Sequence, residues 1–490
     1  MPAKRSLTLA LALLLVAAIP ARGASFPAIT VVDTIRPGMG SSYAMWEPVR
    51  LGDHLYFSAD DGTVGAELWR TNGTSTNRVA DINLTPGAGS NPYGFTAFGD
   101  WVYFSADDGT VGAEVWRTNG TVTELFADIN TTGFGSSGPA SFIALGGWLY
   151  FSATQGDTDR ELWRTNGTIT SRVADINSGA DGSYPTYFAT LGDWLYFQAV
   201  DNTHGNELWR TNGTITELVE DINTNATDGS GPYGMTALGD WLYFSASDST
   251  RGTELWRTNG TVTELVEDIR PTGSDSSDPY GYTAFNDWLY FQAVDNTHGA
   301  ELWRTNGTIT ELVEDINATG GSSSYPYGFT AIGNYLYFGA ATNTTGYELW
   351  RTNGTTTSIL VDIITGVTDS YPRYFTVLGD YLYFYANSDG GISRIWRVDE
   401  ANEFDYAFLP GTNAFIDCMC QRAISTLNGR LFAAYGSDET GIEFAYLDEP
   451  TFGLPETNRD GSAWSTALVL LAAVTAAAGL TVRMREVKRT

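Results

Sequence analysis

The stretch from residue 280 to residue 316 reads YGYTAFNDWLYFQAVDNTHGAELWRTNGTITELVEDI, and it decides the fold. Four runs rich in aromatic, aliphatic and β-branched side chains occupy residues 282–285, 288–293, 301–305 and 308–316. No helical periodicity runs through them. Asn286-Asp287 is a turn dipeptide, and Asn306-Gly307 is the strongest short signal for a type I′ hairpin. The stretch therefore predicts four short antiparallel strands.

The same pattern recurs along the chain at a spacing of 46 or 47 residues. Its second run carries a tyrosine in each of the first eight copies: Tyr56, Tyr103, Tyr150, Tyr196, Tyr243, Tyr290, Tyr337 and Tyr383. A degenerate ninth copy has Leu431-Phe432 there. Four strands in roughly 47 residues are typical of one propeller blade. Because apolar side chains point to both faces of the second run, each sheet should be covered on both sides. We expect an all-β propeller.

The two ends of the repeat array complement each other. Residues 31–35 match the fourth run of a repeat, with no first three runs before them. The last copy, residues 423–447, has three runs and no fourth. An N-terminal strand that completes the last sheet would close the ring and remove free sheet edges. The sequence thus predicts nine four-stranded blades. The alternatives are a ring of eight with one copy left outside, and an open solenoid.

The chain ends carry targeting patterns. Residues 1–23 combine Lys4 and Arg5 with an apolar run and small residues before Ala24, as a secretory signal peptide does. Residues 463–482 contain no charge and are followed by a basic tail, which indicates a transmembrane helix. A GPI signal is the alternative.

These patterns divide the chain into five parts: a signal peptide at 1–23, a propeller ectodomain at 24–449, a linker at 450–462, a transmembrane helix at 463–482 and a cytoplasmic basic tail at 483–490. They predict a single-pass type I protein of the plasma membrane with its N-terminus outside. The membrane would be contacted through the C-terminal helix. Face assignment of the blade loops predicts that the tight turns look toward the membrane and the longer acidic loops look outward.

Composition excludes several classes of function. The 490 residues include 57 Asp and Glu but only 27 Lys and Arg, for a net charge of −30. A polyanionic chain without basic clusters is unsuited to nucleic acid. Three histidines and two cysteines are too few for a disulfide scaffold or a zinc cluster. Cys418 and Cys420 could pair with each other or with another chain, although a Cys-x-Cys ring is strained.

The run Glu301-Leu302-Trp303-Arg304-Thr305-Asn306-Gly307-Thr308 resembles the ELWxxDGT repeat of secreted and surface proteins, most of them bacterial. The loop at 60–67 (DDGTVGAE) and the connector at 268–271 (DIRP) resemble that family as well. The resemblance covers about residues 30–447 and implies a secreted propeller-like array without a defined activity. Here Asn replaces the family's Asp in the turn, which creates a glycosylation sequon, and the hairpin lacks the family's second Gly-Thr.

Twelve sequons follow the signal peptide, and we expect use of several if the source is a eukaryote. Seven lie in the Asn-Gly-Thr turn and five elsewhere: Asn72, Asn119, Asn166, Asn212, Asn259, Asn306 and Asn353, then Asn83, Asn130, Asn225, Asn317 and Asn343.

Calcium is the cofactor to test, because it takes carboxylate and carbonyl oxygens. The candidate ligands are the paired acids of the loop after the second strand, Asp60, Asp61, Asp107 and Asp108. The competing interpretation is that these are turn residues only.

Other recurring side chains are expected to be structural. The tryptophans of the Trp-Arg step should be core residues, and the arginines should pair with neighbouring acids between blades. His204 and His298 lie at matching loop positions without a nucleophile beside them.

The sequence therefore favours a non-enzymatic cell-surface protein that presents an acidic, glycosylated propeller to a protein or glycan partner on its outward face. The alternatives are a coat or matrix component, and a glycoside hydrolase with a carboxylate pair in its channel. A unique carboxylate pair inside the channel would favour the enzyme.

Overall fold

A computed structural model of the chain describes residues 29–33, 35–36, 42, 48–132, 135–179, 181–225, 228–388, 392–399, 404–406, 425–437 and 441–448. Contacts divide the chain into two units, Met1–Glu449 and Pro450–Thr490, and the fold below is that of the first. The predicted signal peptide, linker, transmembrane helix and tail, and Cys418 and Cys420, lie outside the described residues. Within the described part of the chain, no helix has the length and apolar character needed to cross a membrane.

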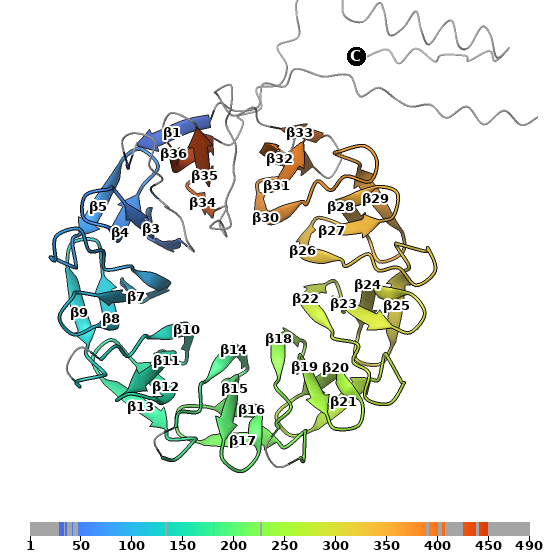
Figure 1. The fold of residues 1–490 in the computed structure, drawn as a ribbon, viewed down its shortest axis with the longest axis horizontal. Coiled ribbons are helices and arrows are strands. Elements are labelled where there is room, and N and C mark those ends of the chain that lie inside the picture. The colour runs from blue at the N-terminus through green and yellow to red at the C-terminus, as the bar shows by residue number, and fades with distance from the viewer. Residues whose placement is uncertain are drawn as a thin grey trace, which may run out of the picture. The chain divides into compact units, whose positions relative to one another are not determined.

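The described residues form β-strands that assemble into four-stranded antiparallel sheets, here called blades (Figure 1). Blade 1 contains β2 (Val49–Leu51), β3 (His54–Asp60), β4 (Ala66–Thr71) and β5 (Thr76–Ala80). Blade 2 contains β6 (Tyr93–Phe98), β7 (Trp101–Asp107), β8 (Ala113–Thr118) and β9 (Thr123–Ala127). Blade 3 contains β10 (Ala140–Leu145), β11 (Trp148–Gln155), β12 (Asp159–Thr165) and β13 (Thr170–Ala174). Blade 4 contains β14 (Thr186–Leu191), β15 (Trp194–Asp201), β16 (Gly205–Thr211) and β17 (Thr216–Glu220).

The later blades repeat this order. Blade 5 contains β18 (Tyr233–Leu238), β19 (Trp241–Asp248), β20 (Gly252–Thr258) and β21 (Thr263–Glu267). Blade 6 contains β22 (Tyr280–Phe285), β23 (Trp288–Asp295), β24 (Gly299–Thr305) and β25 (Thr310–Glu314). Blade 7 contains β26 (Tyr327–Ile332), β27 (Tyr335–Thr342), β28 (Gly346–Thr352) and β29 (Thr357–Val361). Blade 8 contains β30 (Arg373–Leu378), β31 (Tyr381–Ser388), β32 (Ile392–Asp399) and β33 (Phe404–Tyr406).

The remaining strands combine the two ends of the repeat array. β34 (Ser425–Leu427), β35 (Arg430–Ser437) and β36 (Gly441–Asp448) are joined by β1 (Ile29–Asp33), which pairs antiparallel with β36. We call this sheet blade 9. The prediction of repeated four-stranded antiparallel blades is confirmed, and the architecture is that of a β-propeller.

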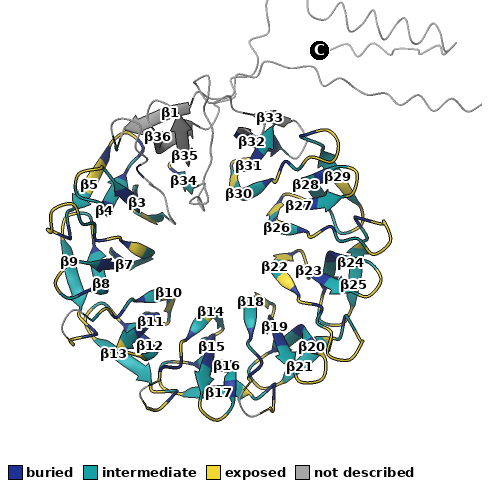
Figure 2. Ribbon diagram, viewed as in Figure 1, coloured by how far each residue is buried: buried dark blue, intermediate teal, exposed yellow. Residues whose placement is uncertain are grey.

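The hydrophobic core lies between successive blades rather than inside any one of them. Leu68 and Tyr56 of blade 1, for example, share a cluster with Val102 and Phe104 of blade 2. The second-strand tyrosines are between 0 and 2 % exposed, so each sheet is covered on both faces as expected. Buried residues gather in the middle strands and exposed residues in the loops (Figure 2). The tryptophans of the Trp-Arg step pack against these clusters, which agrees with a core role.

The outer hairpin differs from the predicted type I′ turn. In blade 6 the turn residues are Asn306 to Ile309, and the backbone N–H of Asn306 donates to the carbonyl of Ile309 at 3.1 Å. Asn306 Oδ1 also accepts from two backbone N–H groups of the loop, both at 2.9 Å. Only Gly307 has a positive φ, +83°, where a type I′ turn needs two. The asparagine side chain thus closes a four-residue loop, and the fourth strand begins later than predicted.

The arginines of the Trp-Arg step connect neighbouring blades, although not through acids. Arg304 Nη1 donates to the carbonyl of Gly354 in the next blade at 2.7 Å, while its Nε binds Glu311 of its own blade at 2.8 Å. The guanidinium lies 4.1 Å from the ring centre of Trp288. The same arrangement occurs at three further positions: Arg117, Arg210 and Arg257. The acid therefore pairs within the blade, and the contact between blades is made to a turn carbonyl.

Candidate functional site

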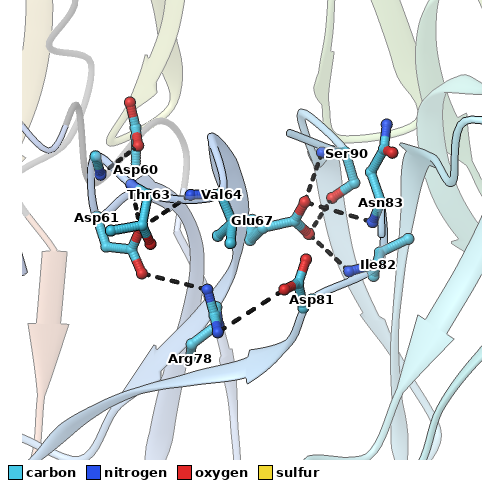
Figure 3. Close-up of polar contacts among 11 residues, drawn as sticks. Asp60, Asp61, Thr63, Val64, Glu67, Arg78, Asp81, Ile82, Asn83 and Ser90 are labelled. Atoms are coloured by element: carbon cyan, nitrogen blue, oxygen red, sulfur yellow. Dashed lines mark hydrogen bonds and ion pairs between the residues drawn. The ribbon is translucent and has the colours of Figure 1, made fainter. Parts of the chain in front are cut away.

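Each of blades 1 to 7 buries a glutamate of its third strand completely. These side chains are 0 % exposed: Glu67, Glu114, Glu161, Glu207, Glu254, Glu301 and Glu348. In blade 1, Glu67 accepts backbone hydrogen bonds from Ile82 at 2.9 Å and Ser90 at 2.8 Å, and the Ser90 hydroxyl donates to it at 2.6 Å (Figure 3). Ile82 and Ser90 belong to the connector that leads to blade 2. The carboxylate thus fastens this connector to the blade, and we call the arrangement the glutamate clamp.

The clamp recurs in blades 1 to 6, whereas in blade 7 Glu348 accepts only through Oε2, from Ile363 and the Ser370 hydroxyl. In blade 6, Glu301 accepts from the backbone N–H groups of Ile316 at 2.9 Å and Ser324 at 2.8 Å, and from the Ser324 hydroxyl at 2.6 Å. Burial raises the pKa of Glu301 to about 7, against the opposing effect of these hydrogen bonds. The pKa values of Glu254 and Glu348 are raised to about 7 in the same way. These three carboxyls therefore take up protons near neutral pH, and burial also raises the pKa values of the other four clamp glutamates.

The sequence analysis did not predict the glutamate clamp, although the sequence contains a signal for it. The glutamate begins the Glu-Leu-Trp motif, and its serine lies 22 or 23 residues later, beyond a variable connector. Both residue types recur in step through seven copies. A carboxylate and a hydroxyl at a fixed separation predict a contact only once the connector is known to fold back onto the third strand.

The loop acids predicted as calcium ligands already have partners in blade 1. Asp60 pairs with Arg36 at 2.8 Å, and Asp61 pairs with Arg78 at 3.2 Å. One oxygen of each also accepts a backbone N–H two residues ahead, at 2.6 Å and 2.8 Å. These are the contacts of an Asx turn. A guanidinium therefore takes the place near Asp61 where a metal ion would have to bind.

Blade 2 has the same turns without a cation. Asp107 Oδ1 accepts from Gly109 at 2.7 Å, and Asp108 Oδ1 accepts from Thr110 at 2.8 Å and Val111 at 3.0 Å. No basic side chain of the described residues pairs with either acid. The turn contacts alone account for this loop, and calcium at Asp107 and Asp108 stays a prediction.

The cation beside the loop acid comes from different strands in different blades. In blades 1 and 3 it is an arginine of the fourth strand, Arg78 or Arg172. In blades 4, 5 and 6 it is a loop residue three positions after the aspartate, His204, Arg251 or His298. The aspartate raises the pKa of His204 and His298, which favours the charged imidazolium. In each of these blades a nearby cation thus compensates the charge of the aspartate, but the residue that supplies the cation differs between blades.

One cluster of three acids in blade 3 has the spacing of a metal site. One ligand oxygen from each of Asp159, Glu161 and Asp175 lies within 4.8 Å of the others. Arg172, however, pairs with Asp159 at 2.9 Å and with Asp175 at 3.4 Å. The guanidinium already pairs with both aspartates, and Glu161 is engaged in its clamp, so these acids support no metal proposal.

The structure separates the sequons into two groups. Asn83, Asn130 and Asn317 are 6, 2 and 4 % exposed, and Asn130 Nδ2 donates to the carbonyl of Gly156 at 2.6 Å. A glycan on these nitrogens would have no room in the folded protein. The other nine are partly or fully exposed: Asn72, Asn119, Asn166, Asn212, Asn225, Asn259, Asn306, Asn343 and Asn353. In the hairpin loops the side-chain oxygen is engaged with the backbone, and Nδ2 is left toward solvent.

The first strands of blades 4 to 8 line a pocket of about 570 Å³ on the inner side of the propeller. Its wall consists of aromatic residues, glycines, threonines and one methionine: Tyr187, Phe188, Gly234, Met235, Thr236, Tyr280, Gly281, Tyr282, Thr283, Gly328, Phe329, Thr330, Tyr374 and Phe375. A second pocket, of about 530 Å³, shares Tyr187 and Phe188 and extends toward β10. The wall of neither pocket contains a carboxylate, an imidazole or a thiol among the described residues. The carboxylate pair that would favour a hydrolase is absent from both.

Comparison with known proteins leaves the chain without an assigned family. No family model matches it, and no curated protein is significantly similar. Similar solved structures include the computationally designed Ika8 protein, with 12 % identity and a TM-score of 0.40 over 73 % of this chain and 96 % of that one. The β-propeller domain of the Trilobed protease from Pyrococcus furiosus has 9 % identity and a TM-score of 0.33, over 71 % of this chain and 100 % of that one.

Two larger enzymes are matched over part of their length. A puromycin-hydrolyzing peptidase from Mycobacterium tuberculosis shows 10 % identity and a TM-score of 0.37, over 76 % of this chain and 61 % of that one. The GH74 xyloglucanase from Xanthomonas campestris shows 15 % identity and a TM-score of 0.34, over 85 % of this chain and 68 % of that one. The assignment of the propeller rests on the strand order and the repeated contacts described above.

Proposed function

We propose that this chain is a non-enzymatic recognition protein of the cell surface, built as a glycosylated nine-bladed propeller. The wall of the inner pocket carries the proposal, because its described residues offer aromatic rings and hydroxyls but no carboxylate, imidazole, amine or thiol. The recurring carboxylates are engaged elsewhere, in clamps, Asx turns and ion pairs.

Contacts between the first and last blades support the closed ring of nine. Besides the pairing of β1 with β36, Arg430 Nη1 donates to the carbonyl of Gly73 in blade 1 at 2.7 Å. Leu427 and Phe432 of blade 9 share a hydrophobic cluster with Leu55 and Phe57 of blade 1. Blade 9 therefore contacts blade 1 with the same kinds of interaction that join the other neighbours.

Surface display is proposed from the targeting patterns at the two chain ends. The test uses the full-length chain with an epitope inserted after Ala24. We expect an antibody to label intact, unpermeabilised cells. Labelling only after permeabilisation would overturn the type I topology and the surface location together.

Recognition is tested with the same cells. The full-length chain is cross-linked on intact cells, and the captured partners are identified by mass spectrometry. One saturable protein or glycoconjugate partner would support recognition, whereas bulk incorporation without any saturable partner would favour the coat or matrix alternative. Turnover of a glycan or peptide by the purified chain would contradict the non-enzymatic assignment.

Glycosylation is proposed at the nine partly or fully exposed sequons. Enzymatic removal of N-glycans converts each occupied asparagine to aspartate, which peptide mass spectrometry can locate. We expect conversion at exposed hairpin sites such as Asn119 and Asn259, and none at the buried Asn83, Asn130 and Asn317. Conversion at the buried sites, or at no site in a eukaryotic host, would overturn the assignment.

A further inference from the structure

The first strand of seven blades departs from regular strand geometry at one position. At this position, the second residue of the strand, the backbone φ is positive: Gly94, Ser141, Tyr187, Gly234, Gly281, Gly328 and Tyr374. The register of the first two strands shifts here in every blade of this set, which marks a β-bulge. Glycine suits this backbone, whereas tyrosine is strained at φ values of +54° and +58°.

The two strained tyrosines lie at opposite ends of one pocket. Tyr187 belongs to β14 and Tyr374 to β30, and both line the pocket formed by the strands between them. Tyr187 is 56 % exposed. Its ring lies 6.5 Å from that of Tyr233, measured between ring centres, and more than half of the residue stays exposed. Tyr184, Tyr325 and Tyr371 also have a positive φ, so the position on the pocket wall, together with the strain, singles out Tyr187 and Tyr374.

The glycines between the two tyrosines keep the pocket open. A Cβ atom on Gly328 would lie 2.8 Å from the ring of Phe375, and one on Gly234 would lie 3.0 Å from the ring of Tyr282. These rings are anchored by contact with the buried aromatics of the second strands, for example Phe375 with Phe384 at 5.6 Å between ring centres. The result is a fixed aromatic floor, with peptide groups and threonine hydroxyls exposed beside it and a tyrosine at each end.

The chemistry of this wall selects a class of ligand. The wall carries no charged side chain, and the chain as a whole has a net charge of −30, so an anionic ligand is disfavoured. Aromatic faces beside hydroxyl and peptide groups suit a ligand with both apolar faces and hydroxyls. An extended peptide would need to pair with an inner edge strand, but the bulges interrupt the regular backbone pattern that such pairing requires.

We propose that the pocket between Tyr187 and Tyr374 binds a neutral oligosaccharide, with the two tyrosine rings as stacking platforms at its ends. The proposal rests on the recognition function proposed above and assigns that function a site and a ligand class. The bulge glycines leave room for the sugar rings, and threonine hydroxyls lie along the floor. Those of Thr236 and Thr330 donate to the carbonyls of Gly234 and Gly328 and can still accept hydrogen bonds from a ligand.

The test measures binding of four probes to the full-length protein in detergent by isothermal titration calorimetry: cellohexaose, maltohexaose and chitohexaose as neutral ligands, and hexagalacturonic acid as an anionic one. We expect saturable binding of at least one neutral hexasaccharide and none of the anionic one. Tyr187→Gly and Tyr374→Gly should each weaken binding by about 5- to 10-fold, the size of a lost stacking contact. Because glycine relieves the backbone strain, neither variant should lower the melting temperature.

Tyr184→Gly is the matched control. Tyr184 is also an exposed tyrosine with a positive φ, +49°, but it does not line the pocket. Its replacement should leave oligosaccharide binding unchanged. The proposal is overturned if no neutral hexasaccharide binds, if only the anionic one binds, or if Tyr184→Gly weakens binding as much as Tyr187→Gly. In each case a saturable partner captured on intact cells by the Tyr187→Gly variant would leave the recognition function standing and exclude only this site.

Discussion

The acids of this propeller fall into two sets that differ in what surrounds them. The clamp glutamates are fully buried, and in blades 1 to 6 the same three kinds of donor reach them: two backbone N–H groups and a serine hydroxyl. The loop aspartates are partly exposed, and their cationic partner changes from arginine to histidine or is missing. A buried carboxylate must have all its hydrogen bonds, whereas one near solvent can exchange a partner for water. The identity of the partner therefore varies more in the second set, although blade 8 has Arg394 at the position of the clamp glutamate.

The comparison is tested most strongly by removing one clamp. Glu301→Ala leaves the backbone N–H of Ile316 without its acceptor. The N–H and the hydroxyl of Ser324 lose Glu301 and keep only the carbonyl of Ala300, at 3.0 Å and 3.5 Å. We expect a loss of roughly 3–5 kcal/mol of local stability, seen as a lower melting midpoint. Glu314→Ala, at an exposed residue of the same blade, should change stability by less than about 0.5 kcal/mol. Equal effects of the two variants would remove the distinction between the sets.

A second effect concerns pH. The pKa of Glu301 is about 7 in the folded protein and near 4.5 in an unfolded chain. Between these values the folded protein holds a proton that the unfolded chain has released, so stability falls as pH rises from about 4.5 to 7. His204 and His298 act in the same direction, because their pKa values are raised. We expect a higher melting temperature at pH 5 than at pH 8.

The matched variant for this effect is Glu301→Gln, which has the shape of glutamate but cannot titrate. It should show a shallower decline of the melting temperature across the same pH range. An unchanged slope would mean that Glu301 does not exchange its proton on unfolding in this window.

A smaller effect is expected at the loop cation. Arg78→Leu gives blade 1 the residue that blade 2 has at the same place, Leu125. The lost ion pairs with Asp61 and Asp81 are partly exposed, so we expect at most about 1 kcal/mol. Leu125→Arg is the reciprocal variant, which should pair with Asp108 and stabilise blade 2 slightly. A loss as large as that of Glu301→Ala, measured by chemical denaturation, would contradict the comparison.

The smallest effect is expected from calcium. Because the Asx turns of Asp107 and Asp108 are complete without an ion, the melting temperature should be the same in calcium and in chelator. A reproducible increase with calcium that disappears in Asp108→Asn would establish the predicted metal site. Asp61→Asn, whose aspartate already pairs with Arg78, is the control.

Much of the fold was predictable because short runs of β-prone residues and the turns between them determine where the strands form. The residues of blade 6 predict its four strands through their β-prone runs and the turn at Asn286-Asp287. The matching ends of the array predict the pairing of β1 with β36. The clamp could not be predicted with the same ease, because Glu301 meets Ser324 only when the connector folds back. The strain at Tyr187 is likewise invisible until the bulge gives that position its φ.

The arginine contact between blades has a consequence for how such a chain can lengthen. The arginines of blades 2, 4, 5 and 6 each donate to a glycine carbonyl 50 positions later, so each of these blades finds the same acceptor in its successor. Residues 195–223 and 289–317 are identical at 28 of 29 positions and lie 94 residues apart, which is two repeats. If a copy of a two-blade segment were inserted into the gene, the arginine-to-carbonyl contact could form with the neighbouring blade at both ends of the insert. The number of blades can therefore change in a single genetic event without a new kind of contact between blades.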